Sequence, residues 1–93
     1  MSTDLLNPLL DRALTLHPQV ALRPEPFGAL AYHYGNRRLV FLQHTDMVAV
    51  AGALAHHPNL AATLDACGID RRRWPLFTKA VESLMKSEII VER

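Results

Sequence analysis

The chain has 93 residues, of which 49% are hydrophobic and 20% are charged, and its net charge is +1. This length supports one modest hydrophobic core, and the composition is too apolar and too weakly charged for a disordered chain. Near-neutrality argues against a general nucleic-acid binder, and no apolar run approaches the roughly 20 residues of a membrane span. The N-terminus lacks a secretory signal. We therefore expect one soluble, cytoplasmic domain over residues 1–93.

The spacing of the apolar residues changes along the chain. Residues 4–16 carry leucines at helical spacing, which predicts an N-terminal helix within residues 1–17. Between residues 18 and 44 the period becomes two, and residues 20–23, 29–34 and 38–43 are predicted strands. Gly35-Asn36 favours a tight turn between the last two strands. Prolines 24 and 26 limit the first strand to an edge or irregular position.

Residues 45–91 carry helical patterns. Thr45 or Asp46 is the expected N-cap of a first helix, and Asn59 opens a second that ends at Cys67-Gly68. Asp70 is the expected cap of a third helix, whose apolar stripe runs through residues 76–85. Residues 89–91 are expected to lie against the sheet or the last helix. The fold class is α+β, with a three-stranded antiparallel sheet packed on three helices and an extra N-terminal helix. The expected core includes Leu30, Tyr32, Leu39, Phe41, Val48, Leu54, Leu60, Leu64 and Trp74.

A family resemblance begins at His17, in HPQVALRPEPFGALAYHYGNRRL, and it is most specific in RPEPFG and the tyrosines that follow. This stretch resembles the peptide chaperones of mycofactocin biosynthesis, which belong to the PqqD-like family of precursor-peptide (RiPP) recognition domains. The resemblance extends to the C-terminus. It implies a winged-helix-like arrangement, no cofactor and no chemistry of its own. It also implies that the chain binds the leader of a ribosomally made peptide and presents it to a radical S-adenosylmethionine enzyme, which modifies the peptide's C-terminal Val-Tyr end.

In such domains the leader adds as a further strand beside the third strand, in a groove closed by the last helix. Here those elements are residues 38–43 and 76–85. The residues fit this independently, because an exposed strand edge can pair with an extended peptide and an apolar wall can hold its side chains. We expect Val40→Pro to remove one edge donor and to abolish capture. The candidate peptide-binding residues are Arg37, Arg38, Leu39, Val40, Phe41, Leu42, Gln43, Arg71, Arg73, Phe77, Lys79, Ala80, Val81 and Leu84.

Several residues admit other interpretations. The triplet Arg71–Arg73 is a solvated first helical turn, a ligand-facing rim or a phosphate site. A winged-helix DNA-binding domain, with these arginines on its recognition helix, is the alternative function. A third possibility, a purely structural dimerisation module that forms a homodimer, is compatible with the peptide-chaperone function.

No catalytic or metal site is apparent in the sequence. His56 and His57 are adjacent and point about 100° apart on a helix, so they cannot easily share an ion. Cys67 has no nearby base and is expected to be a structural thiol. The isolated glycines form no phosphate loop. We therefore expect neither a metal site nor enzymatic activity.

Overall fold

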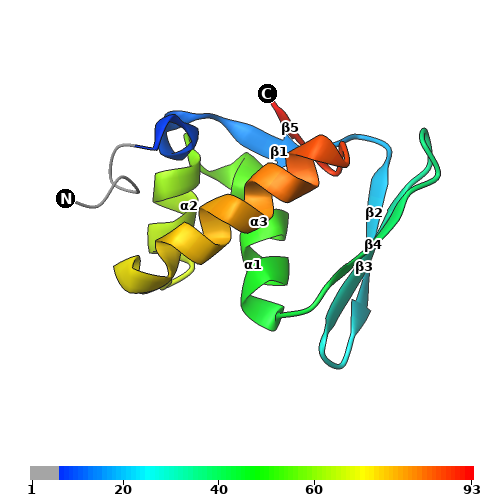
Figure 1. Cartoon of the computed structure of the whole chain (residues 1–93), viewed down its shortest axis with the longest axis horizontal. Coiled ribbons are helices and arrows are strands. Elements are labelled where there is room, and N and C mark those ends of the chain that lie inside the picture. The colour runs from blue at the N-terminus through cyan, green and yellow to red at the C-terminus, as the bar shows by residue number, and fades with distance from the viewer. Residues whose placement is uncertain (1–6) are drawn as a thin grey trace.

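This computed structural model describes residues 7–93. Figure 1 shows the α-helices on one side of a twisted sheet, with α3 passing in front of α1. The α+β class, the three-stranded antiparallel sheet and the three α-helices confirm the prediction. In chain order the elements are η2 (Pro8–Asp11), β1 (Leu14–Leu16), β2 (Val20–Glu25), β3 (Gly28–His33), β4 (Leu39–Leu42), α1 (Thr45–Ala53), η3 (Leu54–His56), α2 (Leu60–Ala66), η4 (Arg71–Arg73), α3 (Trp74–Lys86) and β5 (Ile90–Glu92), where η denotes a 3₁₀-helix.

The larger sheet has the strand order β2-β3-β4, and both of its pairings are antiparallel. Successive residues of a strand point to opposite faces. Ala29 and Ala31 of β3 and Leu42 of β4 face the helices and are buried. Their neighbours in sequence point to the opposite face, away from the helices. The sheet therefore has one packed face and one free face.

The N-terminal segment differs from its prediction. Residues 7–17 form η2 and the strand β1 instead of the predicted short helix, and the rest of that helix lies outside the described residues. The side chain of Asn7 accepts a hydrogen bond from the Leu9 N–H at 2.9 Å, which starts η2 with Pro8 in its first turn. β1 then pairs with β5, with Leu14 opposite Glu92. Leu9 and Leu10 are buried in η2, and Leu14 is buried in a strand pairing between distant parts of the chain.

The ends of the helices follow the predicted capping residues in three of four cases. Asn59 and Asp70 accept hydrogen bonds from the backbone N–H groups of Ala62 and Arg72, both at 2.8 Å. Gly68 ends α2 with a φ of 71°, and Ile69 folds back onto its last turn. The expected cap of α1 is wrong, because His44 is the N-cap residue and makes no side-chain cap bond. The Asp46 carboxylate pairs with Arg73 instead, at 3.0 Å.

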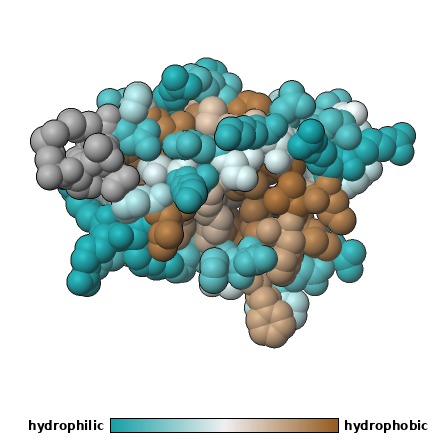
Figure 2. Space-filling model, viewed as in Figure 1, coloured by the Kyte–Doolittle hydropathy of each residue, from teal (hydrophilic) through white to brown (hydrophobic). Residues whose placement is uncertain are grey.

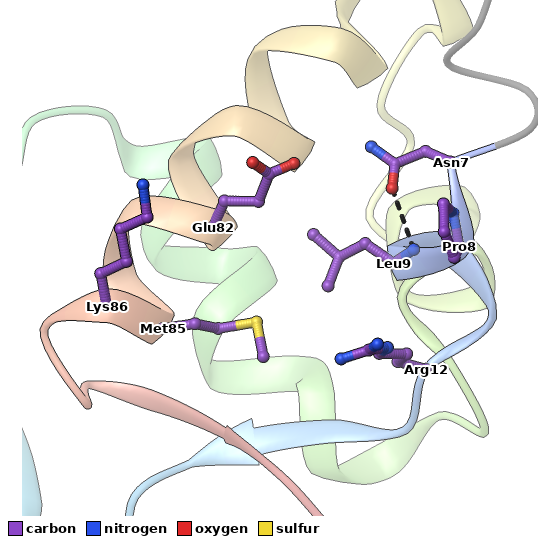
Figure 3. Close-up of a pocket in the computed structure, with 7 residues that line it drawn as sticks. All are labelled: Asn7, Pro8, Leu9, Arg12, Glu82, Met85 and Lys86. Carbon is purple, nitrogen blue, oxygen red and sulfur yellow. Dashed lines mark hydrogen bonds between the residues drawn. The ribbon is translucent and has the colours of Figure 1, made fainter.

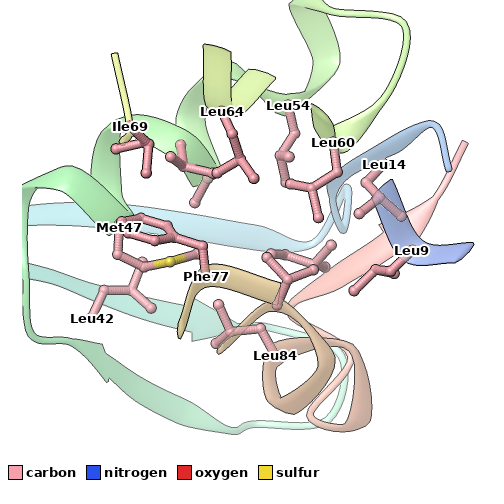
Figure 4. Close-up of a cluster of buried hydrophobic side chains, with 14 of the residues drawn as sticks. Leu9, Leu14, Leu42, Met47, Leu54, Leu60, Leu64, Ile69, Phe77 and Leu84 are labelled. Atoms are coloured by element: carbon pink, nitrogen blue, oxygen red, sulfur yellow. The ribbon is translucent and has the colours of Figure 1, made fainter. Parts of the chain in front are cut away.

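The core fills the space between the helices and the packed face of the sheet, and β5 closes it at the end of α3 (Figure 4). Leu54, Leu60, Leu64 and Trp74 are buried, as predicted. Leu39 and Phe41 were expected in the core, but they are 61% and 45% exposed because they lie on the free face. Leu30 and Tyr32 share that face and are half-buried, and Val48 packs against the edge of the core.

Gly28 lies very close to the backbone of β4, so we expect a larger residue at this position to destabilise the fold. A Cβ atom at Gly28 would lie 1.8 Å from the carbonyl oxygen of Leu42, so the strands would have to move apart. We expect Gly28→Ala to lower the free energy of unfolding by about 3 kcal/mol in urea titrations. The matched control is Gly52→Ala in α1, where nothing lies within 4 Å of the new Cβ. That substitution is expected to stabilise the fold by about 0.5–1 kcal/mol. Equal stability of Gly28→Ala and the wild type would contradict the close approach.

Candidate functional site

The site is built around the outer edge of β4, which has a partner strand only on its β3 side within residues 7–93. The His33 N–H donates to the Arg38 carbonyl at 2.9 Å, which makes these residues a hydrogen-bonded pair. Such pairs alternate along an antiparallel ladder. Val40 therefore bonds to β3, whereas the N–H and C=O groups of Leu39 and Phe41 point outward. This corrects the expectation for Val40→Pro: the Val40 N–H belongs to the internal ladder and is not an edge donor.

The opposite edge of the sheet is less suited to strand addition. The same alternation turns the backbone groups of Val20, Leu22 and Pro24 to the outer side of β2. Pro24 has no N–H to donate, and the Val20 N–H already donates to His17 at 2.9 Å. β4 contains neither a proline nor a charged residue that would protect its edge. Of the two edges of the sheet, the edge at β4 is therefore better suited to an added strand.

An apolar cleft runs between β4 and α3, and Figure 2 shows hydrophobic surface between the helix and the sheet. It has two lobes, of about 260 Å³ and 370 Å³, which share His44, Met47 and Ala80. The first lobe lies along β4, and the second lies by the first turns of α3. The remaining lining residues are Val40, Phe41, Leu42, Gln43, Ser83 and Leu84 in the first lobe and Arg73, Leu76 and Phe77 in the second. A free strand edge and an apolar wall therefore lie side by side.

Polar contacts connect the elements of the cleft at both of its ends. At one end the Asn36 amide donates to the Ser87 carbonyl at 3.3 Å and to the Glu88 carboxylate at 3.1 Å. The loop that carries Asn36 differs from the predicted tight turn, because it continues to Arg37, which has a φ of 64°. At the other end, the ion pair between Arg73 and Asp46 joins the start of α3 to the start of α1. These contacts fix the position of α3 relative to β4.

The three arginines of the triplet mostly contact side chains close to them in the fold. The Arg71 guanidinium lies 4.9 Å from the centre of the Trp74 ring, and the side chain of Arg72 bonds to Asp70. Arg73 is the member that reaches the cleft, where it also lies over the Phe77 ring. The triplet thus combines a solvated turn with one cleft-lining residue, and nothing in this arrangement favours the DNA-binding alternative.

The structure brings together most, but not all, of the candidate peptide-binding residues. Eight of them line the cleft: Val40, Phe41, Leu42, Gln43, Arg73, Phe77, Ala80 and Leu84. Arg37, Arg38, Leu39, Arg71 and Lys79 are exposed outside both lobes, and Val81 is fully buried in the core. Four further lining residues were not among the candidates predicted from the sequence: His44, Met47, Leu76 and Ser83. Leu76 and Met47 belong to rows of apolar residues that the sequence predicts on two helices. Helical spacing does not show which residues of such a row are buried in the core and which line a cleft.

A second pocket, of about 290 Å³, lies on the other side of α3 (Figure 3). The side chains of Glu82 and Met85 face it from α3, and those of Leu9 and Arg12 face it from the N-terminal segment. Glu82 is the only carboxylate in α3. Because it lies on this side, the cleft face of α3 carries no acidic residue.

The described residues offer little reactive chemistry. Within residues 7–93 no three His, Cys, Asp or Glu side chains are placed to hold a metal ion together. Burial, and secondarily the nearby Asp46 carboxylate, raise the pKa of the Cys67 thiol, which keeps it protonated and weakly nucleophilic. None of the helices in the described part of the chain could span a membrane.

Comparisons with known proteins show which family this chain resembles. Residues 13–91 match the model of the peptide chaperone MftB family. The peptide chaperone MftB of Mycobacterium ulcerans is 43% identical over 81 residues, which cover 87% of this chain and 74% of the relative. That of Mycobacterium tuberculosis is 42% identical over 83 residues, covering 89% and 76%. That of Mycolicibacterium smegmatis is 42% identical over 81 residues, covering 87% and 79%. No solved structure matches the chain significantly.

The cap that starts η4 and α3 gives a pH prediction. Mainly the backbone N–H of Arg72, and then its side chain, lower the pKa of the Asp70 carboxyl. A pKa lower in the folded than in the unfolded state stabilises the fold above the unfolded value of about 3.9, and this contribution disappears as the pH falls through the folded pKa. We expect the wild type to be more stable than Asp70→Asn at neutral pH and equal to it in strong acid. The measurement is thermal unfolding of both proteins across that pH range. In strong acid both side chains are neutral and asparagine can still cap the helix. A difference in stability between the two proteins that persists there would therefore contradict the assignment.

Proposed function

This chain belongs to the peptide chaperone MftB family, and we propose that it captures the leader of a ribosomally made precursor peptide by adding it as a strand to β4. The captured peptide is then presented in the cytoplasm to a radical S-adenosylmethionine enzyme of mycofactocin biosynthesis. The observation that carries the proposal is that no strand within residues 7–93 pairs with the outer edge of β4, which lies beside an apolar cleft.

The added strand would be held by two kinds of contact. Its backbone would pair with the outward N–H and C=O groups of Leu39 and Phe41, which any extended peptide can do. Alternate side chains would point into the cleft against Val40, Ala80 and Leu84, and these contacts select the sequence. Affinity thus comes mainly from the main chain and specificity from the cleft.

Charge favours a leader with acidic residues near its apolar anchors. Arg73, directly before α3, lines the cleft while it pairs with Asp46, and Lys79 is exposed on α3, whereas Glu82 faces the opposite pocket. Such rim charges accelerate association more than they strengthen the complex. Ordering a flexible leader opposes binding, whereas holding peptide and enzyme on one scaffold raises their effective concentration.

Phe41→Pro tests strand addition directly. The Phe41 N–H points away from β3, so a proline should remove an edge donor without removing a bond of the internal ladder. We expect this variant to remain folded and to lose at least about tenfold in affinity for the cognate precursor peptide, the short peptide ending in Val-Tyr. Isothermal titration with the synthetic peptide is the measurement.

Phe41→Ala is the matched control, because it removes the same ring but keeps the N–H. It should bind the peptide more tightly than Phe41→Pro does. If both variants lose affinity equally, the ring and not the edge donor carries the interaction. Wild-type affinity in a folded Phe41→Pro protein would contradict strand addition at β4.

A further inference from the structure

The free face of the sheet carries an apolar patch that shares only Phe41 with the lining of the cleft. We define this outer-face patch as Leu30, Tyr32, Tyr34, Leu39 and Phe41. The register places Leu30 opposite Phe41 and Tyr32 opposite Leu39. Tyr34 packs edge-on against Tyr32, with 4.8 Å between ring centres, and is 62% exposed. The core lies on the other face, so packing within the fold does not explain these side chains.

A contiguous exposed patch of this kind is typical of a protein–protein contact. Monomeric proteins rarely expose neighbouring large apolar side chains unless a partner covers them. Tyrosine, phenylalanine and arginine are also enriched in such interfaces. Arg23 lies on the same face of β2, opposite Leu30. The composition of the face therefore fits a partner protein.

The patch is continuous with the edge at which the proposed function places the peptide. A peptide strand added to β4 would lie about 4.8 Å from β4. Every second side chain of that strand would point to the outer face, beside Leu39 and Phe41. The loaded chain would then offer one joined surface, made partly of its own residues and partly of the peptide.

Charge distinguishes between the partners that could cover this surface. Arg37 and Arg38 are exposed directly before Leu39, and neither forms an ion pair with another residue in the range 7–93. Glu25, the acidic residue of β2 on the outer face, already pairs with Arg23 at 3.3 Å, so a second copy of the chain would offer these arginines no free carboxylate there. A different protein with an apolar centre and carboxylates at its rim would fit.

We infer that the outer-face patch, joined to the bound peptide strand, is the surface on which the peptide-modifying enzyme docks. The inference rests on the proposed function, because the enzyme must read the chaperone and its captured peptide together. Docking across both components explains how an enzyme can select the loaded chaperone over the empty one. The peptide thereby contributes to its own delivery.

The test compares enzyme binding with and without the cognate precursor peptide. Fluorescently labelled chain is titrated with the radical S-adenosylmethionine enzyme, first alone and then with saturating peptide. We expect tighter binding with peptide. The double variant Leu30→Ser with Tyr34→Ser, outside both β4 and the cleft, should lower the affinity of the loaded chain for the enzyme at least about tenfold. Its affinity for the peptide should stay unchanged, which also shows that the variant is folded.

Leu76→Ser is the matched control, because Leu76 is 69% exposed but lines the cleft instead of the outer face. It should weaken peptide capture, yet at saturating peptide it should recruit the enzyme as the wild type does. If the wild type binds no peptide, the proposed function fails and this inference with it. If peptide binds and the double variant still recruits the enzyme fully, only this inference fails. A wild-type dimer in sedimentation that the double variant disperses would assign the patch to a second copy and overturn it.

Discussion

The rest of the site depends on the outer edge of β4, which has no partner strand in the described part of the chain. An antiparallel strand uses every second residue for each neighbour, so a terminal strand must leave half of its backbone groups without a strand partner. In this chain the strand is four apolar residues long and lacks the protective charges or prolines that usually blunt an edge. An edge left so accessible is suited to an added strand.

The surrounding structure keeps this edge accessible and gives it a wall. Gly28 lets β3 and β4 approach closely, so the strand is held firmly on its inner side. Asn36 holds the loop before β4 to the end of α3, and the Arg73–Asp46 ion pair joins the start of α3 to α1. The helix is thus held beside the strand without covering its edge. In the proposed complex, selectivity for one peptide depends on the side chains that line the cleft between α3 and β4.

Local patterns in the sequence predicted much of the fold. Alternation located the strands of the larger sheet, and Asn59, Gly68 and Asp70 marked helix ends because their side-chain or backbone chemistry acts over a few residues. The N-terminal helix failed for the opposite reason. β1 pairs with β5 near the other end of the chain, and leucine spacing within one short segment carries no information about such a distant partner.

The sequence predicted which strand and which helix form the candidate site. It did not predict which of their side chains and backbone groups are exposed there. Both faces of β4 are apolar, so the sequence could not show that Leu42 is buried and Phe41 is exposed. Nor could it show which backbone groups point outward, because that depends on the register with β3. Val81 is fully buried although it shares a helical stripe with Ala80, since the direction of the core is set by the packing of α3.

Amide hydrogen exchange of the free and peptide-bound chain, resolved by residue, tests the central claim most directly. In the free chain the amides of Val40 and Leu42 should exchange slowly, because they bond to β3, and those of Leu39 and Phe41 should exchange quickly. The cognate precursor peptide should slow exchange at Leu39 and Phe41. Protection of these two amides in the free chain, or unchanged exchange there with bound peptide, would contradict the account.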